Sequence, residues 1–186
     1  MTPTLRIDPV RTALLVIDVQ ERLWAVMDAA ERAAVAKHIG ILGALASRLH
    51  LPTVLSEQNP RGLGPTVPEI AAAFPDARRL EKMEFSCVSA ASFAPVFEEL
   101  ARPTWIVCGM ETHVCVYLTA RDLAARGVTV HVPVDAVLSR TARNKQVGLD
   151  LIRTAGGVLT STETVVFDAL AVSGTDDFRA LSRLVK

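Results

Sequence analysis

The sequence contains no long hydrophobic run, although half of its 186 residues are hydrophobic. Its longest unbroken apolar runs, such as residues 13–17 and 106–108, are far shorter than the roughly 18–20 residues that span a bilayer. The first residues, Met1 to Arg6, also lack the charged start and apolar block of a secretion signal. We therefore expect no membrane partner and a cytoplasmic location.

An excess of either charge is missing too, because 20 Lys and Arg residues balance 20 Asp and Glu residues. This balance gives no electrostatic reason to expect nucleic acid or an anionic membrane as a partner. The three cysteines form no Cys-x-x-Cys pair, and an odd number without a secretion signal favours free thiols over disulfides. Internal repeats, low-complexity tracts and domain boundaries are absent, so we interpret residues 1–186 as a single domain.

Short β-branched runs alternate with helical patterns along the chain, which predicts an α/β fold with a parallel sheet. The run Thr12–Ile17 is apolar throughout, as in a central strand that is buried on both faces. Further strands are predicted at residues 53–55, 80–85, 104–108, 128–132 and 158–160. Helices are predicted at residues 29–49, 68–74, 89–101, 112–126 and 141–155 and after Thr175. The result is a three-layer α/β/α, Rossmann-like domain with a doubly wound, mainly parallel, six-stranded sheet.

Two local patterns qualify this outline. Asp28, followed three residues later by Glu31, resembles a capping box at the start of the first long helix. Residues 56–68 contain three prolines and two glycines and are predicted to form an irregular loop. Because structureless loops of this length are uncommon in compact domains, we expect the loop to have a functional or interface role.

Two polar segments follow predicted strands. In open parallel sheets, ligands bind beyond the carboxyl ends of the strands. Asp18 directly follows the first strand, and residues 109–115 follow the strand at 104–108. Cys115 is therefore expected in the first turn of a helix, where N–H groups and the helix dipole would lower the pKa of a thiol.

Each of the three cysteines also has a structural interpretation. Most free cysteines are small buried hydrophobes, and Cys115 could be one of them. Cys108 fits this interpretation better, because it lies within a predicted buried strand. Cys87 is intermediate, since it follows Phe85 in a predicted loop and could line a pocket without reacting.

A nucleophilic cysteine needs a base or a cation beside it. His113 is only two positions from Cys115, so on a helix the two side chains point to different faces. The remaining histidines are scattered, which is typical of surface or packed positions and argues against a zinc site; they are His38, His50 and His131. By position alone, Asp18 is equally compatible with a helix cap, and Lys82 is typical of a solvated surface lysine.

Three ordered motifs resemble the isochorismatase-like cysteine hydrolase superfamily. They lie at residues 15–20 (LVIDVQ), 81–86 (EKMEFS) and 109–116 (GMETHVCV). The similarity continues through residues 135–140 and 160–163, and the loop at 56–64 is most similar to the isochorismatase domain-containing branch. The resemblance implies a catalytic triad of Asp18, Lys82 and Cys115. It also implies a cis peptide bond between Met110 and Glu111, which orients N–H groups near Glu111 and Cys115 as an oxyanion hole.

The chain departs from two kinds of relative. Nicotinamidases of this superfamily bind a metal through an Asp-x-His motif after the triad aspartate, and residues 58–62 contain neither a histidine nor an aspartate. We therefore expect no metal and no other cofactor. True isochorismatases cleave a vinyl ether without a nucleophilic cysteine. The presence of Cys115 instead favours hydrolysis of a small amide-type (C–N) substrate through a thioester.

The substrate pocket and the assembly are less well defined. Gln20, Trp24, Gln58, Phe85 and His113 are the candidate pocket residues, and Trp24 and Phe85 are equally compatible with core packing. Relatives commonly form dimers and larger rings, so the resemblance implies a homo-oligomer. Two alternatives stay open: a catalytically idle member that is kept for assembly, and a redox-sensing thiol protein. For the second, no resolving cysteine is evident near Cys115 in the sequence.

Overall fold

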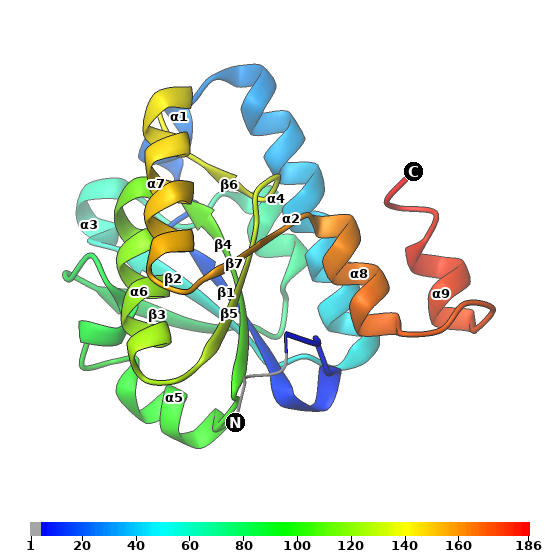
Figure 1. Ribbon diagram of the computed structural model, residues 1–186. Coiled ribbons are helices and arrows are strands. Elements are labelled where there is room, and N and C mark those ends of the chain that lie inside the picture. Colours follow the sequence, from blue (N-terminus) through cyan, green and yellow to red (C-terminus); the bar gives the residue numbers. More distant parts are fainter. Residues whose placement is uncertain (1–4) are drawn as a thin grey trace.

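The computed structural model describes residues 5–186 (Figure 1). Residues 1–4 lie outside the described residues. They belong to the segment Met1 to Arg6, for which we predict no secretion signal. Within residues 5–186 the strands form one seven-stranded sheet in the order β3-β2-β1-β4-β5-β7, with β6 paired to β4. Every pairing between these strands is parallel. The predicted doubly wound α/β fold is confirmed, and the two-residue β6 is added to the six predicted strands.

The elements have the following bounds. The strands are β1 (Thr12–Ile17), β2 (Thr53–Gln58), β3 (Arg78–Lys82), β4 (Thr104–Met110), β5 (Thr129–Pro133), β6 (Val137–Leu138) and β7 (Val158–Thr160). The helices are α1 (Glu21–Ala25), α2 (Ala29–Leu49), α3 (Pro60–Leu63), α4 (Pro68–Ala73), α5 (Ala94–Leu100), α6 (Tyr117–Ala125), α7 (Ala142–Thr154), α8 (Thr162–Leu170) and α9 (Asp176–Leu181). Single helical turns lie at Pro9–Arg11 and Cys87–Ser89, and a π-helical turn, Thr112–Val116, precedes α6.

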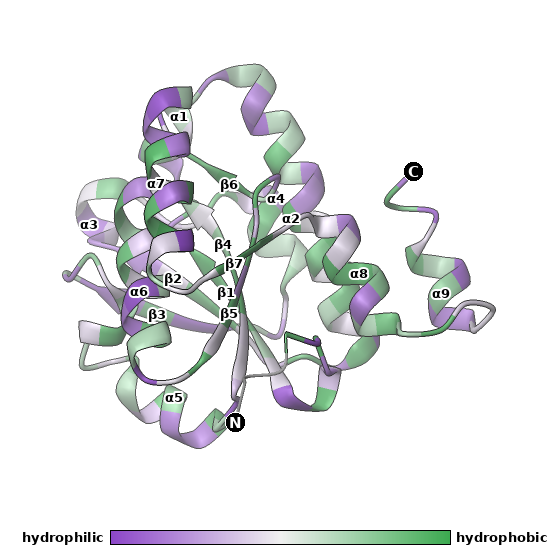
Figure 2. Ribbon diagram, in the orientation of Figure 1, coloured by the Kyte–Doolittle hydropathy of each residue, from purple (hydrophilic) through white to green (hydrophobic). Residues whose placement is uncertain are grey.

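Two hydrophobic cores hold the helices against the two faces of the sheet (Figures 1 and 2). Side chains of β1 alternate between them: Leu14 and Val16 pack under α2, α4 and α8, whereas Leu15 and Ile17 pack under α5, α6 and α7. Each fully buried side chain of this size contributes about 1.5–3 kcal/mol to folding. The central strands are therefore the rigid base on which their carboxyl ends are positioned. Among the described residues, no helix is both long and apolar enough to cross a membrane.

Helix α2 begins where its sequence predicts. The Asp28 carboxylate accepts hydrogen bonds from the backbone N–H groups of Ala30, at 2.9 Å, and Glu31, at 3.1 Å. These bonds satisfy two of the N–H groups that the first turn of a helix leaves without partners. The helix then runs over Ala29–Leu49, as the apolar spacing predicts.

Several segments differ from the sequence-based outline. Helices α1 and α8 were not predicted, and β3 spans Arg78–Lys82 rather than residues 80–85. Strand β2 continues through Ser56, Glu57 and Gln58, so the prediction of a loop from residue 56 is wrong at its start, and α3 lies within the rest. These polar residues remain in the strand because each finds a buried partner at the carboxyl end of the sheet. Helix α5 starts only at Ala94 and not at residue 89, with Pro95 in its first turn, where the missing N–H of proline costs nothing.

Candidate active site

Asp18 lies immediately after β1 and is completely buried. Its backbone has φ +51°, a left-handed conformation that aspartate tolerates better than most residues. The backbone N–H of Asp18 donates to the carbonyl of Ser56 at 3.0 Å, which ties this turn to β2. The carboxylate is therefore held in place on the central part of the sheet.

Lys82 is the last residue of β3, two strands away from β1. Its Nζ donates to Asp18 Oδ2 at 2.6 Å and to Gln58 Oε1 at 2.9 Å. The side chain of Lys82 is only 1% exposed. A lysine whose position alone is typical of a solvated surface residue is thus buried and paired with the carboxylate.

Cys115 lies in the π-helical turn that follows β4, and it is 6% exposed. Its thiol lies close enough to the Asp18 carboxylate for each group to shift the pKa of the other. Gly109 allows this approach, because it has φ +108° and a Cβ there would lie 2.1 Å from the carbonyl oxygen of Ile17. The close contact between β4 and β1 brings Cys115 beside Asp18, and Lys82 reaches the same carboxylate from β3.

The protonation states follow from burial. Burial raises the pKa of the Asp18 carboxyl, against the opposing effects of the Lys82 charge and of hydrogen bonds from Lys82, Ser56 and Cys115. Burial alone would lower the pKa of the Lys82 ammonium, but the negative charge of Asp18 reverses this effect and the pKa is raised. Burial and then the charge of Asp18 also raise the pKa of the Cys115 thiol. The prediction of a lowered thiol pKa is therefore wrong, because the thiol is desolvated beside a carboxylate.

The segment between β4 and Cys115 is anchored from the other side of the site. The peptide bond between Met110 and Glu111 is cis. Glu111 is 7% exposed. Its carboxylate accepts hydrogen bonds from both the backbone N–H and Nε of Arg140, each at 3.1 Å. His113 Nδ1 lies 3.1 Å from Ser139 Oγ. Two residues after β6 thus fix the turn that carries Cys115.

The candidate pocket residues fall into different environments. Gln20 is completely buried, and its side-chain amide bonds with the backbone of Gln58 and with the carbonyl of Gly64. Trp24 is partly buried against the core under α2, whereas Phe85 is 58% exposed. Only Gln58 directly contacts a residue of the Asp18–Lys82 pair through its side chain. The pocket-lining roles of these residues, and of His113, stay predictions.

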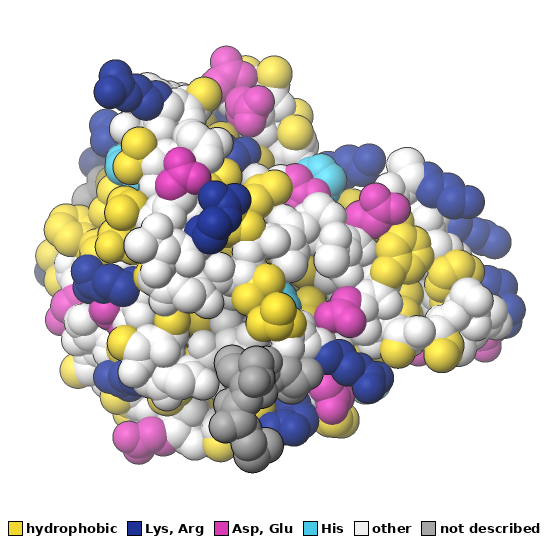
Figure 3. Space-filling model, in the orientation of Figure 1, with side chains coloured by type: hydrophobic (Ala, Val, Ile, Leu, Met, Phe, Trp, Pro, Cys, Tyr) yellow, Lys and Arg dark blue, Asp and Glu magenta, His cyan; other side chains and the backbone are white. Residues whose placement is uncertain are grey.

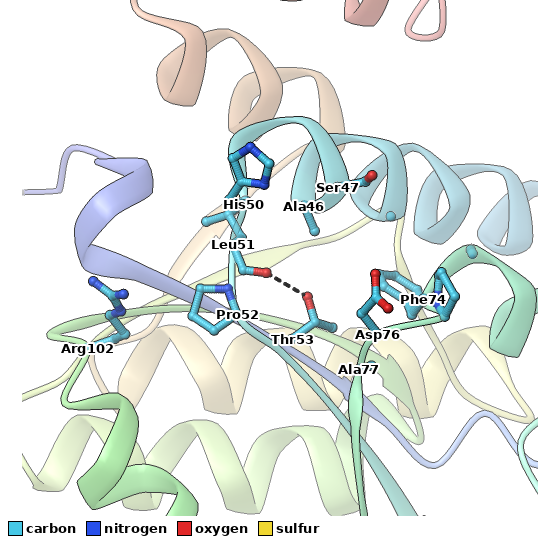
Figure 4. A pocket seen from close by; sticks show the side chains of 13 residues that line it. Ala46, Ser47, His50, Leu51, Pro52, Thr53, Phe74, Asp76, Ala77 and Arg102 are labelled. Atoms are coloured by element: carbon cyan, nitrogen blue, oxygen red, sulfur yellow. Dashed lines mark hydrogen bonds between the residues drawn. The ribbon is translucent and has the colours of Figure 1, made fainter.

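Two cavities lie at different ends of the sheet. One, of about 250 Å³, adjoins Lys82 and is also lined by Pro60, Glu81, Met83, Glu84, Ala91 and Ser92. The other, of about 390 Å³, lies at the amino ends of the strands, where His50, Thr53, Asp76 and Arg102 surround it (Figure 4). None of the predicted site residues lines this larger cavity.

Ser56 was not assigned a role from the sequence, and Cys87 was considered only as a residue that could line a pocket. Ser56 Oγ donates to Asp18 Oδ1 at 2.7 Å, and the strand prediction that ended at residue 55 concealed this contact. Cys87 is buried, and its backbone N–H donates to Thr119 Oγ1 at 3.0 Å. Burial raises the pKa of the Cys87 thiol to about 11, while the charge of Lys82 and hydrogen bonds to Ser56 and Thr119 oppose the rise.

Comparisons with known proteins identify the family of this chain. The model of the isochorismatase domain matches residues 12–164, which include β1, β3 and the π-helical turn. The chain belongs to the isochorismatase domain family. Over the described residues 5–186, no group of three or more His, Cys, Asp or Glu side chains is arranged to hold a metal ion.

Relatives within this family align over nearly the whole chain. Isochorismatase domain-containing protein 2 of Bos taurus is 36% identical over 97% of this chain and 86% of its own length. The secreted isochorismatase effector Isc1 of Phytophthora sojae is 33% identical over 97% of this chain and 87% of its own length.

Two solved structures of similar proteins superpose closely. The MAR1 ribonuclease of Caenorhabditis elegans has a TM-score of 0.88 at 30% identity, covering 97% of this chain and 92% of its own. The YcaC gene product of Escherichia coli, described as an octameric hydrolase of unknown specificity, has a TM-score of 0.90 at 25% identity, covering 99% and 92%. Both the sequence match and the structural superpositions therefore show that this chain has the isochorismatase-like α/β fold.

Proposed function

We propose that this chain is a metal-independent cysteine hydrolase that cleaves a small amide-type (C–N) substrate through a thioester. The observation that carries the proposal is the buried contact of 2.6 Å between Lys82 Nζ and Asp18 Oδ2, with the Cys115 thiol close enough to this carboxylate to be affected by its charge. Buried clusters of ionisable groups with shifted pKa values are concentrated at functional sites. Metal independence rests on residues 58–62, which lack the Asp-x-His motif of metal-binding relatives.

The first half of the proposed reaction forms a covalent intermediate. Asp18 accepts the thiol proton of Cys115 as the sulfur attacks the substrate carbonyl carbon. The carbonyl oxygen becomes an oxyanion, which backbone N–H groups near Glu111 and Cys115 stabilise. The carboxyl group of Asp18 then gives its proton to the departing nitrogen as the C–N bond breaks. An amine leaves, and the acyl group stays on Cys115 as a thioester.

The second half regenerates the enzyme. The ionised Asp18 takes a proton from a water molecule, whose oxygen attacks the thioester carbonyl. Collapse of the second tetrahedral intermediate breaks the C–S bond and returns the proton to the sulfur. The products are a carboxylic acid and a free Cys115 thiol. Lys82 balances the charge of Asp18 in both halves, since a raised pKa keeps it protonated at neutral pH.

A hydrolysis assay on a panel of small amides and ureides tests this proposal. We expect the native chain to release an amine from at least one compound, and Cys115→Ala to lose about a thousandfold or more of that rate. Cys108→Ala is the matched control, because Cys108 is buried in β4 away from the carboxylate. Circular dichroism checks that each variant is folded. Full hydrolysis by Cys115→Ala would rule out the cysteine mechanism.

The same panel includes a short RNA, because one structural neighbour is described as a ribonuclease. The balance of 20 basic and 20 acidic residues favours a small neutral substrate over a polyanion. We expect no cleavage of the RNA by the native chain.

The proposed enzyme is a homo-oligomer in solution. Large apolar side chains are exposed on α7 (Val147 and Leu151) and on and after α8 (Phe167 and Val172), and Figure 3 has hydrophobic side chains at the surface over the α8–α9 region. An octameric neighbour supports the same proposal. Light scattering on the purified chain tests it, and a mass of 20.0 kDa at micromolar concentration would contradict it.

A redox-sensing function is the second candidate, because Cys87 lies in the same buried cluster as Cys115. A peroxide would oxidise the Cys115 thiol to a sulfenic acid and release water. The Cys87 thiol would then attack this sulfur, forming a disulfide and a second water. Mass mapping after peroxide treatment tests the idea. A Cys87–Cys115 disulfide at stoichiometric peroxide would support it, and both thiols remaining reduced would reject it.

A further inference from the structure

Strand β2 lies between the two strands that carry the acidic and basic groups of the site. In the parallel pairing, Ser56 of β2 is opposite Ile17, the residue before Asp18. Gln58 of β2 is opposite Lys82 of β3. Ser56 and Gln58 are two positions apart on one strand, so their side chains point to the same face. That face is the one on which Asp18 and Lys82 meet.

Ser56 contacts the oxygen of Asp18 that Lys82 does not. Its hydroxyl donates to Oδ1 at 2.7 Å, while Lys82 Nζ donates to Oδ2 at 2.6 Å. Ser56 is only 2% exposed, so water cannot easily replace this hydroxyl if it is removed. A carboxylate that is held at both oxygens has one fixed orientation relative to the Cys115 thiol.

Gln58 holds the ammonium in the same way. Its Oε1 accepts from Lys82 Nζ at 2.9 Å, and its Nε2 donates to the carbonyl of Met83 at 2.8 Å. The backbone of Gln58 is clamped in turn by the side chain of Gln20, which donates to its carbonyl at 3.0 Å and accepts from its N–H at 2.7 Å. Because the oxygen and the nitrogen of the Gln58 side-chain amide are both hydrogen-bonded, the amide has a fixed orientation and holds Lys82 in place.

We propose that Ser56 and Gln58 are positioning residues: Ser56 fixes Asp18 to receive the Cys115 proton, and Gln58 fixes Lys82 on Asp18. The inference deepens the proposed function, since it rests on Asp18 acting as the proton acceptor. It also moves Gln58 from the predicted substrate pocket to the support of the lysine. Neither residue needs to touch the substrate.

The pH dependence of Cys115 reactivity reports on Ser56. The charged and titratable groups that face Asp18 are Lys82 from β3, Cys115 from the π-helical turn and Cys87 from the turn at Cys87–Ser89. The Ser56 hydroxyl stabilises the ionised form of Asp18, so its loss raises the pKa of that carboxyl. Asp18 must be ionised to accept the thiol proton. The rise of Cys115 reactivity with pH therefore moves to higher pH when Ser56 is removed.

Alkylation by iodoacetamide across a pH series tests this without a known substrate. Peptide mass spectrometry separates Cys115 from Cys87 and Cys108. We expect Ser56→Ala to move the midpoint of the Cys115 rise upward by about one pH unit, as expected for losing one hydrogen bond to a charged group. Ser56→Thr keeps the hydroxyl and should restore the native midpoint.

Two further variants complete the design. Thr53→Val removes a hydroxyl from the same strand at its other end, where Thr53 bonds to the carbonyl of Leu51, and should leave the profile unchanged. Gln58→Met removes the acceptor from Lys82 at similar side-chain length, and we expect about a tenfold slower alkylation at the plateau with unchanged circular dichroism.

The outcomes separate the two proposals. A Ser56→Ala profile that superposes on the native one, or a shift of equal size in Thr53→Val, overturns the positioning role of Ser56. An unchanged plateau rate in Gln58→Met overturns that of Gln58. Failure of the native chain to hydrolyse any amide or ureide would instead overturn the proposed function, and it would leave the alkylation result standing.

Discussion

The two ends of the parallel sheet differ in what they bury. At the carboxyl end, Asp18 and Lys82 are buried together, the backbone of Asp18 is left-handed, and a π-helical turn carries Cys115. At the amino end lies the larger cavity, of about 390 Å³, whose polar lining residues include the exposed Ser47 and His50 (Figure 4). No buried ion pair of described residues adjoins that cavity.

The buried ion pair therefore lies at the end of the sheet with the smaller of these two cavities. Removing a charge from water is expensive unless it is paired, so a buried pair persists only where its surroundings hold it. Four features at the carboxyl end provide such surroundings. They are the hydrogen bond from Ser56, the hydrogen bond to Gln58, the close contact at Gly109 and the Glu111–Arg140 ion pair. The amino end has space but no comparable support.

The largest effect is expected for Lys82→Met, which leaves the Asp18 carboxyl buried without its cation. Removing one partner of a buried pair costs about 3–5 kcal/mol of unfolding free energy, and hydrolysis should be lost as well. Arg78→Met is the control, because the Arg78–Glu99 pair is exposed and should contribute little. Urea denaturation measures both. Equal, small losses in the two variants would mean that the Asp18–Lys82 pair is not a buried pair in solution.

A smaller effect is expected for Gly148→Ala in α7. A Cβ at Gly148 would lie 2.6 Å from the backbone N of His113, so α7 or the Cys115 turn must move. Overpacking of this kind costs about 1–3 kcal/mol, and Cys115 alkylation should slow. Gly40→Ala in α2 is the matched control, with nothing within 4 Å, and should stabilise the chain by about 0.5–1 kcal/mol. Thermal melts in which Gly148→Ala is more stable than Gly40→Ala would contradict the close packing of α7 against the Cys115 turn.

The smallest effects are expected at the amino end. Ser47→Ala and His50→Asn change residues that line the larger cavity, and asparagine tolerates the left-handed conformation of residue 50. Hydrolysis should stay within about twofold of the native rate, as for most surface substitutions. Loss of activity in either variant would indicate that the functional site lies at the amino end of the sheet, which would contradict the proposed site at the carboxyl end.

Most of the fold could be predicted, because apolar runs and caps act locally. The run Thr12–Ile17 and the Asp28 cap define β1 and the start of α2 from a few residues each. The carboxyl end of β2 could not be predicted in this way. Ser56, Glu57 and Gln58 are polar, and only their partners on other strands and on the following loop make burial favourable.

The candidate site was predictable only in part and for a related reason. Resemblance identified Asp18, Lys82 and Cys115, whereas the position of Lys82 alone suggested a surface residue. The predicted direction of the shift in the Cys115 pKa was wrong. A helix start favours the thiolate, but burial and the charge of Asp18 raise the thiol pKa more strongly. Such effects depend on distances between strands, which no local pattern contains.

The central claim is that Asp18, Lys82 and Cys115 act together as a hydrolytic site, and its most direct test is the intact mass of the chain during turnover. Acid quenching during hydrolysis of an active amide or ureide should reveal one acyl group. Peptide mapping should place it on Cys115, and it should be absent from Cys115→Ala and from Asp18→Asn. Hydrolysis that proceeds with no acyl adduct, or with an adduct on another residue, would contradict the account.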